Sequence, residues 1–134
     1  MMKTAGFVSL LIVSAFVAPQ AFAQDYNGAW ANDASACSKL FTKSGTQTIM
    51  KSDADLHGSG FVIDGNQIRG KMARCNVKIR KQDGDLVHLG ATCSTDVAVD
   101  TVQFTLKRID QNKIARMFPG LPELETTYVR CPNL

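Results

Sequence analysis

Residues 74–94 read RCNVKIRKQDGDLVHLGATCS, and this stretch decides the fold. Apolar residues alternate with polar ones from Cys75 to Ile79 and again from Val87 to Cys93, with the period of two that is typical of half-buried strands. The intervening Asp83-Gly84-Asp85 is a turn sequence. We therefore expect an antiparallel hairpin. If residues 83–85 form a three-residue loop, Gln82 faces Leu86, and the same register places Cys75 opposite Cys93.

The four cysteines of the chain extend this prediction. Intervals of 37, 17 and 37 residues separate them, so no closely spaced pair of the kind that zinc sites use is present. An even number of widely spaced cysteines in a small secreted domain indicates disulfides. We expect Cys75 to bond Cys93 within the hairpin, and Cys37 to bond Cys131.

The first 23 residues have the features of a secretory signal peptide. A single cation, Lys3, precedes an apolar run from Ala5 to Ala18, and residues 21–23 read Ala-Phe-Ala. We expect cleavage between Ala23 and Gln24, which leaves residues 24–134 as one domain and lowers the formal net charge from +3 to +2. The run is too short for a transmembrane helix. The expected location is the periplasm or the extracellular space.

The rest of the chain is patterned mainly as short strands. One amphipathic helix is expected over Asp33–Thr42, because Cys37, Leu40 and Phe41 fall at helical spacing after a capping residue. Polar turns separate the strands that follow, which are expected near residues 46–50, 61–63, 67–71, 73–80, 87–93, 102–106, 114–118 and 125–131. The prediction is a mainly β fold: an antiparallel meander of about seven strands in a small barrel or half-barrel, with one short N-terminal helix and two disulfides.

Gly28-Ala29-Trp30 resembles the Gly-x-Trp with which lipocalin-type barrels begin. The resemblance implies a barrel that carries a small apolar ligand, with its Trp closing the bottom of the barrel. We therefore take Trp30 as a candidate residue near a ligand-binding mouth. In the alternative interpretation, Trp30 is a hydrophobic plug.

A second candidate surface is basic. No acid lies between Asp64 and Asp83, a segment that holds six cations. On a regular strand Arg74, Lys78 and Arg80 share one face, where they could bind an anionic partner. The alternative is a solvated face whose cations discourage edge pairing. Nucleic acid is not expected, because no aromatic residues interleave with the cations.

The segment 117–124, MFPGLPEL, is apolar and stiffened by prolines. Such a loop could insert into a partner's cleft, because stiffness lowers the entropy cost of binding. Phe118 and Leu121 are the residues that would make this contact. In the alternative interpretation, the same two side chains cap the open end of the sheet.

Metal binding and catalysis find little support in the sequence. Asp53, Asp55 and Asp64 have the spacing of ligands in the calcium loop of a helix–loop–helix motif. However, His57 occupies one of the ligand positions, and a strand is expected where that motif has its second helix. A polar connecting loop is the better interpretation. No nucleophile, metalloprotease or phosphate-loop motif occurs, so no cofactor and no enzymatic activity are expected.

The sequence therefore favours a non-enzymatic periplasmic or secreted binding protein that acts on a protein or an anionic envelope component through its basic sheet face. Two alternatives stay open: a lipocalin-like carrier of a small apolar ligand, and an enzyme with an unrecognised site.

Overall fold

The structure is a computed structural model that describes residues 25–132 and 134. The expected signal peptide and its cleavage site lie outside the described residues. The described part is mainly β and contains one short α-helix, so the predicted fold class is confirmed.

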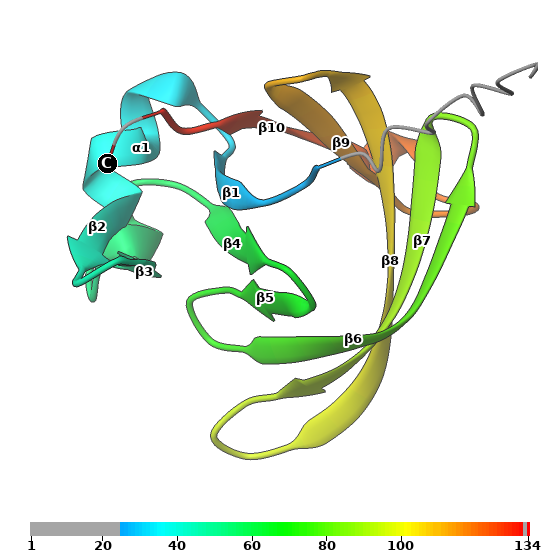
Figure 1. Ribbon diagram of the computed structural model, residues 1–134, viewed down its shortest axis with the longest axis horizontal. Helices are drawn as coiled ribbons and strands as arrows, with labels where there is room; N and C mark the ends of the chain where they lie inside the picture. Colours follow the sequence, from blue (N-terminus) through cyan, green and yellow to red (C-terminus); the bar gives the residue numbers. More distant parts are fainter. Residues whose placement is uncertain (1–24, 133) are drawn as a thin grey trace, which may run out of the picture.

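Eight antiparallel strands close into a barrel (Figure 1). Neighbours along the chain pair with each other from β4 to β10, and β1 closes the barrel by pairing with both β4 and β10. The barrel is thus a closed meander and not a half-barrel. Its strands are β1 (Gly28–Ala31), β4 (Gly60–Asp64), β5 (Gln67–Arg69), β6 (Arg74–Asp83), β7 (Leu86–Ser94), β8 (Val99–Asp110), β9 (Lys113–Met117) and β10 (Thr126–Arg130).

The apolar and polar residues that alternate in the sequence lie on the inner and outer faces of the barrel wall, respectively. In β7 the buried residues are Val87, Leu89, Ala91 and Cys93, and the residues between them are partly exposed. The inward side chains of all eight strands form one core. Its buried members are Tyr26, Trp30, Ile63, Ile68, Cys75, Val77, Val87, Leu89, Ala91, Cys93, Leu106, Ile114 and Tyr128.

A second, smaller core lies outside the barrel. Ala29 and Ala31 of β1 and Val62 of β4 point outward and are covered by the chain between these strands, chiefly by Leu40 and Phe41. Figure 1 shows this outer layer beside β1 and β4. It contains η1 (Ala34–Ala36), α1 (Cys37–Leu40), the hairpin of β2 (Phe41–Ser44) and β3 (Gln47–Met50), and η2 (Ala54–Leu56).

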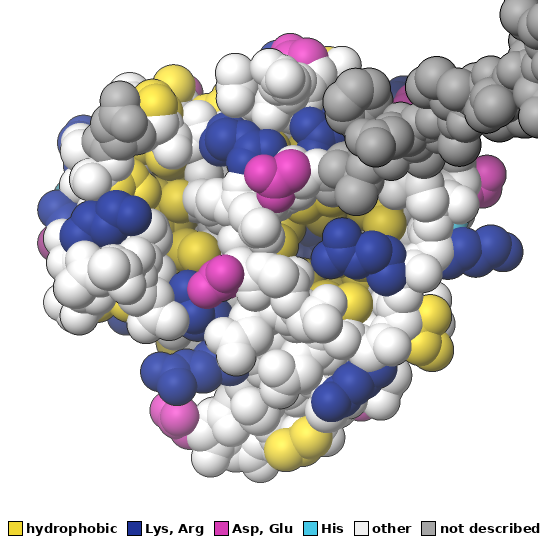
Figure 2. Space-filling view, in the orientation of Figure 1, with side chains coloured by type: hydrophobic (Ala, Val, Ile, Leu, Met, Phe, Trp, Pro, Cys, Tyr) yellow, Lys and Arg dark blue, Asp and Glu magenta, His cyan; other side chains and the backbone are white. Residues whose placement is uncertain are grey.

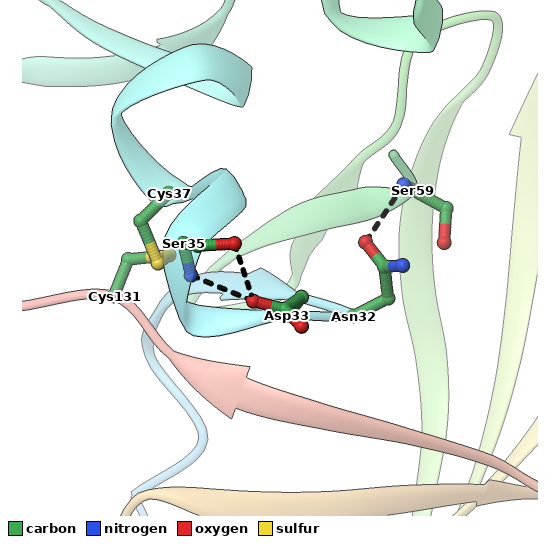
Figure 3. Close-up of a disulfide and its surroundings, with 6 residues drawn as sticks. All are labelled: Asn32, Asp33, Ser35, Cys37, Ser59 and Cys131. Carbon is green, nitrogen blue, oxygen red and sulfur yellow. Dashed lines mark hydrogen bonds between the residues drawn. A yellow bond between two sulfur atoms is a disulfide. The ribbon is translucent and has the colours of Figure 1, made fainter. Parts of the chain in front are cut away.

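The helix expected over Asp33–Thr42 is shorter than its pattern indicates. Asp33 does cap it, accepting hydrogen bonds from the Ser35 amide at 2.8 Å and the Ser35 hydroxyl at 2.6 Å (Figure 3). The first turn is 3-10, however, and α-helix covers only Cys37–Leu40. Phe41 and Thr42, which both favour strands, pair instead with residues of β3.

Both predicted disulfides are confirmed. Cys37 bonds Cys131 and so ties α1 to the end of β10 (Figure 3), while Cys75 bonds Cys93 across β6 and β7. The register between β6 and β7 differs from the one expected. The turn has two residues between Asp83 and Leu86, and a bulge at Lys78 restores the register in which Cys75 faces Cys93.

The two ends of the barrel differ in their loops. At the closed end, short polar turns join β4 to β5, β6 to β7 and β8 to β9. At the open end the connections are longer and include the segment 118–125 with η3 (Pro122–Leu124). Among the described residues, no helix has the length and apolar character needed to cross a membrane.

Candidate functional site

A cavity of about 220 Å³ opens between the strands at the open end of the barrel. Its wall is formed mainly by apolar side chains of the inner face, and its rim by small residues at the start of β4 and in the β5–β6 loop. The lining residues are Ser59, Gly60, Phe61, Ile63, Ile68, Gly70, Ala73, Cys75, Phe104, Leu106, Arg116 and Tyr128.

Arg116 is the charged residue in this apolar lining. It lies in β9 two residues after the fully buried Ile114, so both side chains point into the barrel. Directly beside it on the neighbouring strands are Leu106 and Thr126. The strand register therefore places a guanidinium group among the apolar side chains of the cavity.

Aromatic rings hold Arg116 in place. Its guanidinium carbon lies 4.8 Å from the ring centroid of Phe104 and 4.8 Å from that of Phe118. Each cation–π contact of this kind stabilises by about 0.5–2 kcal/mol. Within residues 25–132 and 134, the N–H groups of Arg116 make no hydrogen bond, so they stay available as donors.

Arg116 has no counter-ion among the described residues. The ion pairs within residues 25–132 and 134 involve His57, Arg69 and His88, and none of them includes Arg116. Arg108 and Arg130 are partly buried to a similar degree, but their guanidinium groups donate to backbone carbonyls. This cavity therefore has an apolar wall and one unneutralised positive charge.

The other end of the barrel is filled by side chains. Trp30 is fully buried, and its indole N–H donates to the Tyr26 carbonyl at 2.8 Å. The guanidinium carbon of Arg130 lies 4.4 Å from the Trp30 ring centroid, and that of Arg108 lies 4.5 Å from the Tyr26 ring centroid. Stacked arginines and aromatic rings thus close this end.

Arg130 also connects the segments that meet there. Its guanidinium donates to the carbonyls of Asp25, Asn27 and Gln111. Burial lowers the pKa of Arg130, while the nearby Asp25 acts in the opposite direction. The position of Trp30 in this closed end separates it from the cavity, whose lining does not include it.

The prediction that Arg74, Lys78 and Arg80 share one face is wrong. Lys78 is the bulged residue of β6, and beyond it the phase of the strand is reversed. Arg80 pairs with the inward-facing Leu89, and it reaches the Gly65 carbonyl at the closed end. Arg74 points outward before the bulge, so these cations do not form a continuous stripe.

The segment 117–124 lies at the open end, where Phe118 is half-buried against Arg116. Leu121 and Leu124 are each about half exposed. The position of Phe118 agrees with the interpretation in which this loop caps the open end of the sheet. Leu121 extends from the same loop into solvent.

The segment that imitates a calcium loop forms the single 3-10 turn η2. His57 lies 3.4 Å from Asp53, and the part of the chain that the structure describes contains no group of three or more residues that could hold a metal ion. His88 lies on the outer face of β7, where its Nδ1 is 3.1 Å from the hydroxyl of Thr105.

Sequence reasoning missed Arg116. The signal was a charged residue on the apolar phase of a strand, two positions after Ile114. Its significance depends on Phe104, Phe118 and Tyr128, which the chain alone does not bring together.

Comparison with protein-family models, with curated proteins and with solved structures finds no match for this chain. The fold and the cavity define its class: a small, disulfide-linked, closed antiparallel β-barrel with an apolar cavity at one end.

Proposed function

We propose that this protein is a non-enzymatic binding protein that holds a small apolar molecule with a carboxylate head group in its barrel. The observation that carries the proposal is Arg116, a cation without a counter-ion on the wall of an apolar cavity. Pockets of this kind combine apolar walls, which supply affinity, with a few polar groups, which fix orientation.

The size of the cavity limits the ligand. A cavity of about 220 Å³ is smaller than the ~300–1,000 Å³ typical of pockets for drug-sized ligands. It suits a short chain, with its head group at the rim. Longer chains would have to extend out of the open end.

The chemistry of the lining supports an amphipathic anion. Phe61, Ile68 and Leu106 offer apolar contact for a hydrocarbon chain. The free N–H edge of Arg116 suits a carboxylate, which it can bind through two parallel hydrogen bonds. The two residue types meet at the same cavity, so one molecule can use both.

The proposed location is the periplasm or the extracellular space. Two disulfides among the described residues are consistent with an oxidising compartment, and the signal-peptide pattern of residues 1–23 supports export. The role proposed for this compartment is binding and carriage rather than catalysis.

Calorimetric titration with hexanoate and 1-hexanol tests this proposal, because the two probes share a chain length and differ in charge. We expect hexanoate to bind more tightly. Replacing Arg116→Leu should weaken hexanoate binding ten-fold or more, which corresponds to about 1.4 kcal/mol or more, and should leave hexanol binding within about two-fold.

Arg80→Gln is the matched control, since it removes a cation that contacts the closed end of the barrel. It should leave hexanoate affinity unchanged. The proposal fails if wild-type protein binds neither probe, or if both arginine variants lose hexanoate affinity to the same extent.

A further inference from the structure

Two adjoining hollows of about 540 and 350 Å³ lie on the outer side of the barrel. They run between β3 of the outer hairpin and the surface of β5 and β6. Both are lined by Ile49, Arg69, Arg74 and Ser94, so they form one continuous outer groove.

The outer groove is strongly basic. Four cations line it, and the acid in its lining is Asp96. Figure 2 shows separate Lys and Arg side chains at the hairpin and beside β5 and β6, with Asp or Glu side chains next to some of them. The four cations are Lys51, Arg69, Lys71 and Arg74.

Two of these cations are direct neighbours in the sheet. Arg69 of β5 pairs with Arg74 of β6 in the strand register, so the two side chains start from adjacent positions on the outer face. Like charges directly opposite each other destabilise a sheet. An anion bound between them would remove this repulsion.

Arg69 is the more buried of the two paired arginines. Its side chain is only 16% exposed, and its Nε is buried without a hydrogen-bond partner. The guanidinium donates to the Gln67 side-chain oxygen at 3.3 Å and to the Thr48 carbonyl at 3.4 Å, and it forms a long ion pair of 3.9 Å with Asp64. A buried donor without a partner usually has a structural or functional reason.

The remaining cations are held at the rim by backbone carbonyls. Lys51 donates to the Ser38 carbonyl at 2.8 Å, and Lys71 donates to the Ser52 carbonyl at 2.5 Å. An ammonium group has three donors, so each lysine keeps others for a ligand. These contacts fix the positions of two charges beside the arginine pair.

We infer that the outer groove is an oxyanion site for a phosphate group that carries two or more negative charges. Arg69 and Arg74 provide the planar donors that match phosphate oxygens, and the two lysines add point charges. The site lies outside the barrel and goes beyond the proposed carboxylate cavity.

Calorimetric titration with inorganic pyrophosphate tests the site on the wild-type protein and on two variants. Arg74→Gln removes an exposed cation of the groove, and Arg80→Gln removes an exposed cation from the same strand beyond the bulge. Both variants lower the net charge equally. We expect Arg74→Gln to weaken binding ten-fold or more and Arg80→Gln to stay within two-fold of wild type.

Added salt should weaken the binding, because ionic screening acts over about 8 Å at physiological ionic strength. Absence of pyrophosphate binding would overturn the inference, as would equal losses in the two variants, which would indicate a net-charge effect. Arg74→Gln should also raise Tm slightly without ligand, because it removes the like-charge repulsion; a loss of Tm would instead indicate structural damage and overturn this explanation of the arginine pair.

Vesicles distinguish the sources of the phosphate. The probes are phosphatidylcholine vesicles with and without phosphatidic acid, measured by co-sedimentation. Suppose that the protein binds pyrophosphate. If the wild-type protein then co-sediments with the phosphatidic acid vesicles and the Arg74→Gln variant does not, a lipid head group is the source of the phosphate. Lack of retention supports a soluble phosphate. Retention without any pyrophosphate binding overturns the site.

Discussion

The guanidinium carbon of Arg116 lies 4.8 Å from the centroid of the Phe104 ring, on the inner face of the barrel. The contact positions a cation in an apolar wall, and no ion pair within residues 25–132 and 134 neutralises it. A charge kept in this state contributes little to stability. It does favour an anionic ligand.

Arg116→Leu should therefore leave the stability of the free protein nearly unchanged. The substitution loses cation–π contacts worth about 0.5–2 kcal/mol each, and it gains by removing a half-buried charge that lacks a counter-ion. We expect the free energy of unfolding to change by no more than about 1 kcal/mol. Urea denaturation without ligand measures it. A loss of 3 kcal/mol or more would show that Arg116 is mainly structural.

Arg130→Leu, in contrast, should lower the free energy of unfolding and leave ligand binding intact. It leaves the carbonyls of Asp25, Asn27 and Gln111 without their shared donor and removes the cation stacked on Trp30. We expect a loss of about 1.5–3 kcal/mol in urea denaturation, the contribution typical of hydrogen bonds to a charged group. Under conditions where the variant stays folded, hexanoate affinity should be retained. Loss of binding in a folded variant would contradict the separation of the two ends.

The two disulfides should contribute unequally. Cys75–Cys93 spans 18 residues and Cys37–Cys131 spans 94, and loop-closure entropy grows with loop length. Replacing each pair by alanines should cost about 3 and about 4.7 kcal/mol, respectively. Denaturation of the two double variants measures the order. A larger loss from the shorter loop would show that local packing outweighs chain entropy.

Gly60→Ala should destabilise the barrel more than Gly70→Ala. A Cβ at Gly60 would lie 2.5 Å from the Trp30 carbonyl oxygen and 2.9 Å from the Phe41 ring, whereas at Gly70 its nearest neighbour would be 3.8 Å away. Strands β1 and β4 would have to separate at Gly60. We expect a loss of about 1–3 kcal/mol, typical of overpacking, against less than about 0.5 kcal/mol at Gly70. Equal Tm values for the two variants would contradict this.

The helix cap formed by Asp33 should make the stability of the protein depend on pH. The hydrogen bonds from Ser35 lower the pKa of Asp33 below its ordinary value of 3.8. A lowered folded-state pKa means that this contribution is present above the unfolded-state pKa and is lost as pH falls through the folded-state pKa. The Tm difference between wild type and Asp33→Ala should therefore be larger at pH 6 than at pH 2. Ser35→Ala should reduce the same pH dependence, and a difference independent of pH would contradict this origin.

The cysteine pairing illustrates how sequence reasoning succeeded within the β6–β7 hairpin. Alternation placed Cys75 and Cys93 on the apolar phase, and the turn at Gly84 limited the possible registers. The expected loop was one residue too long, while the bulge at Lys78 was not expected at all. These two differences cancel at the cysteines. They do not cancel at Arg80, which therefore faces the other way.

The prediction of the helix failed for a different reason. Helical spacing of Cys37, Leu40 and Phe41 is compatible with one helix, but it is also compatible with a turn followed by a strand. In the structure Phe41 pairs with Met50 in the outer hairpin and packs in the same outer core as Val62. Tertiary packing commonly overrides the helix or strand propensity of a short segment, because these propensities are small.

Sequence alone determined the mainly β character, most turn positions and both disulfides of this protein, because alternation and turn residues act over neighbouring positions along the chain. Only the tertiary structure decided which strands close the barrel and which charges meet. The strand register placed Arg116 beside Phe104 and Arg69 beside Arg74. A single bulged residue reverses the faces of a strand, so the positions of functional side chains depend on backbone details that residue patterns do not encode.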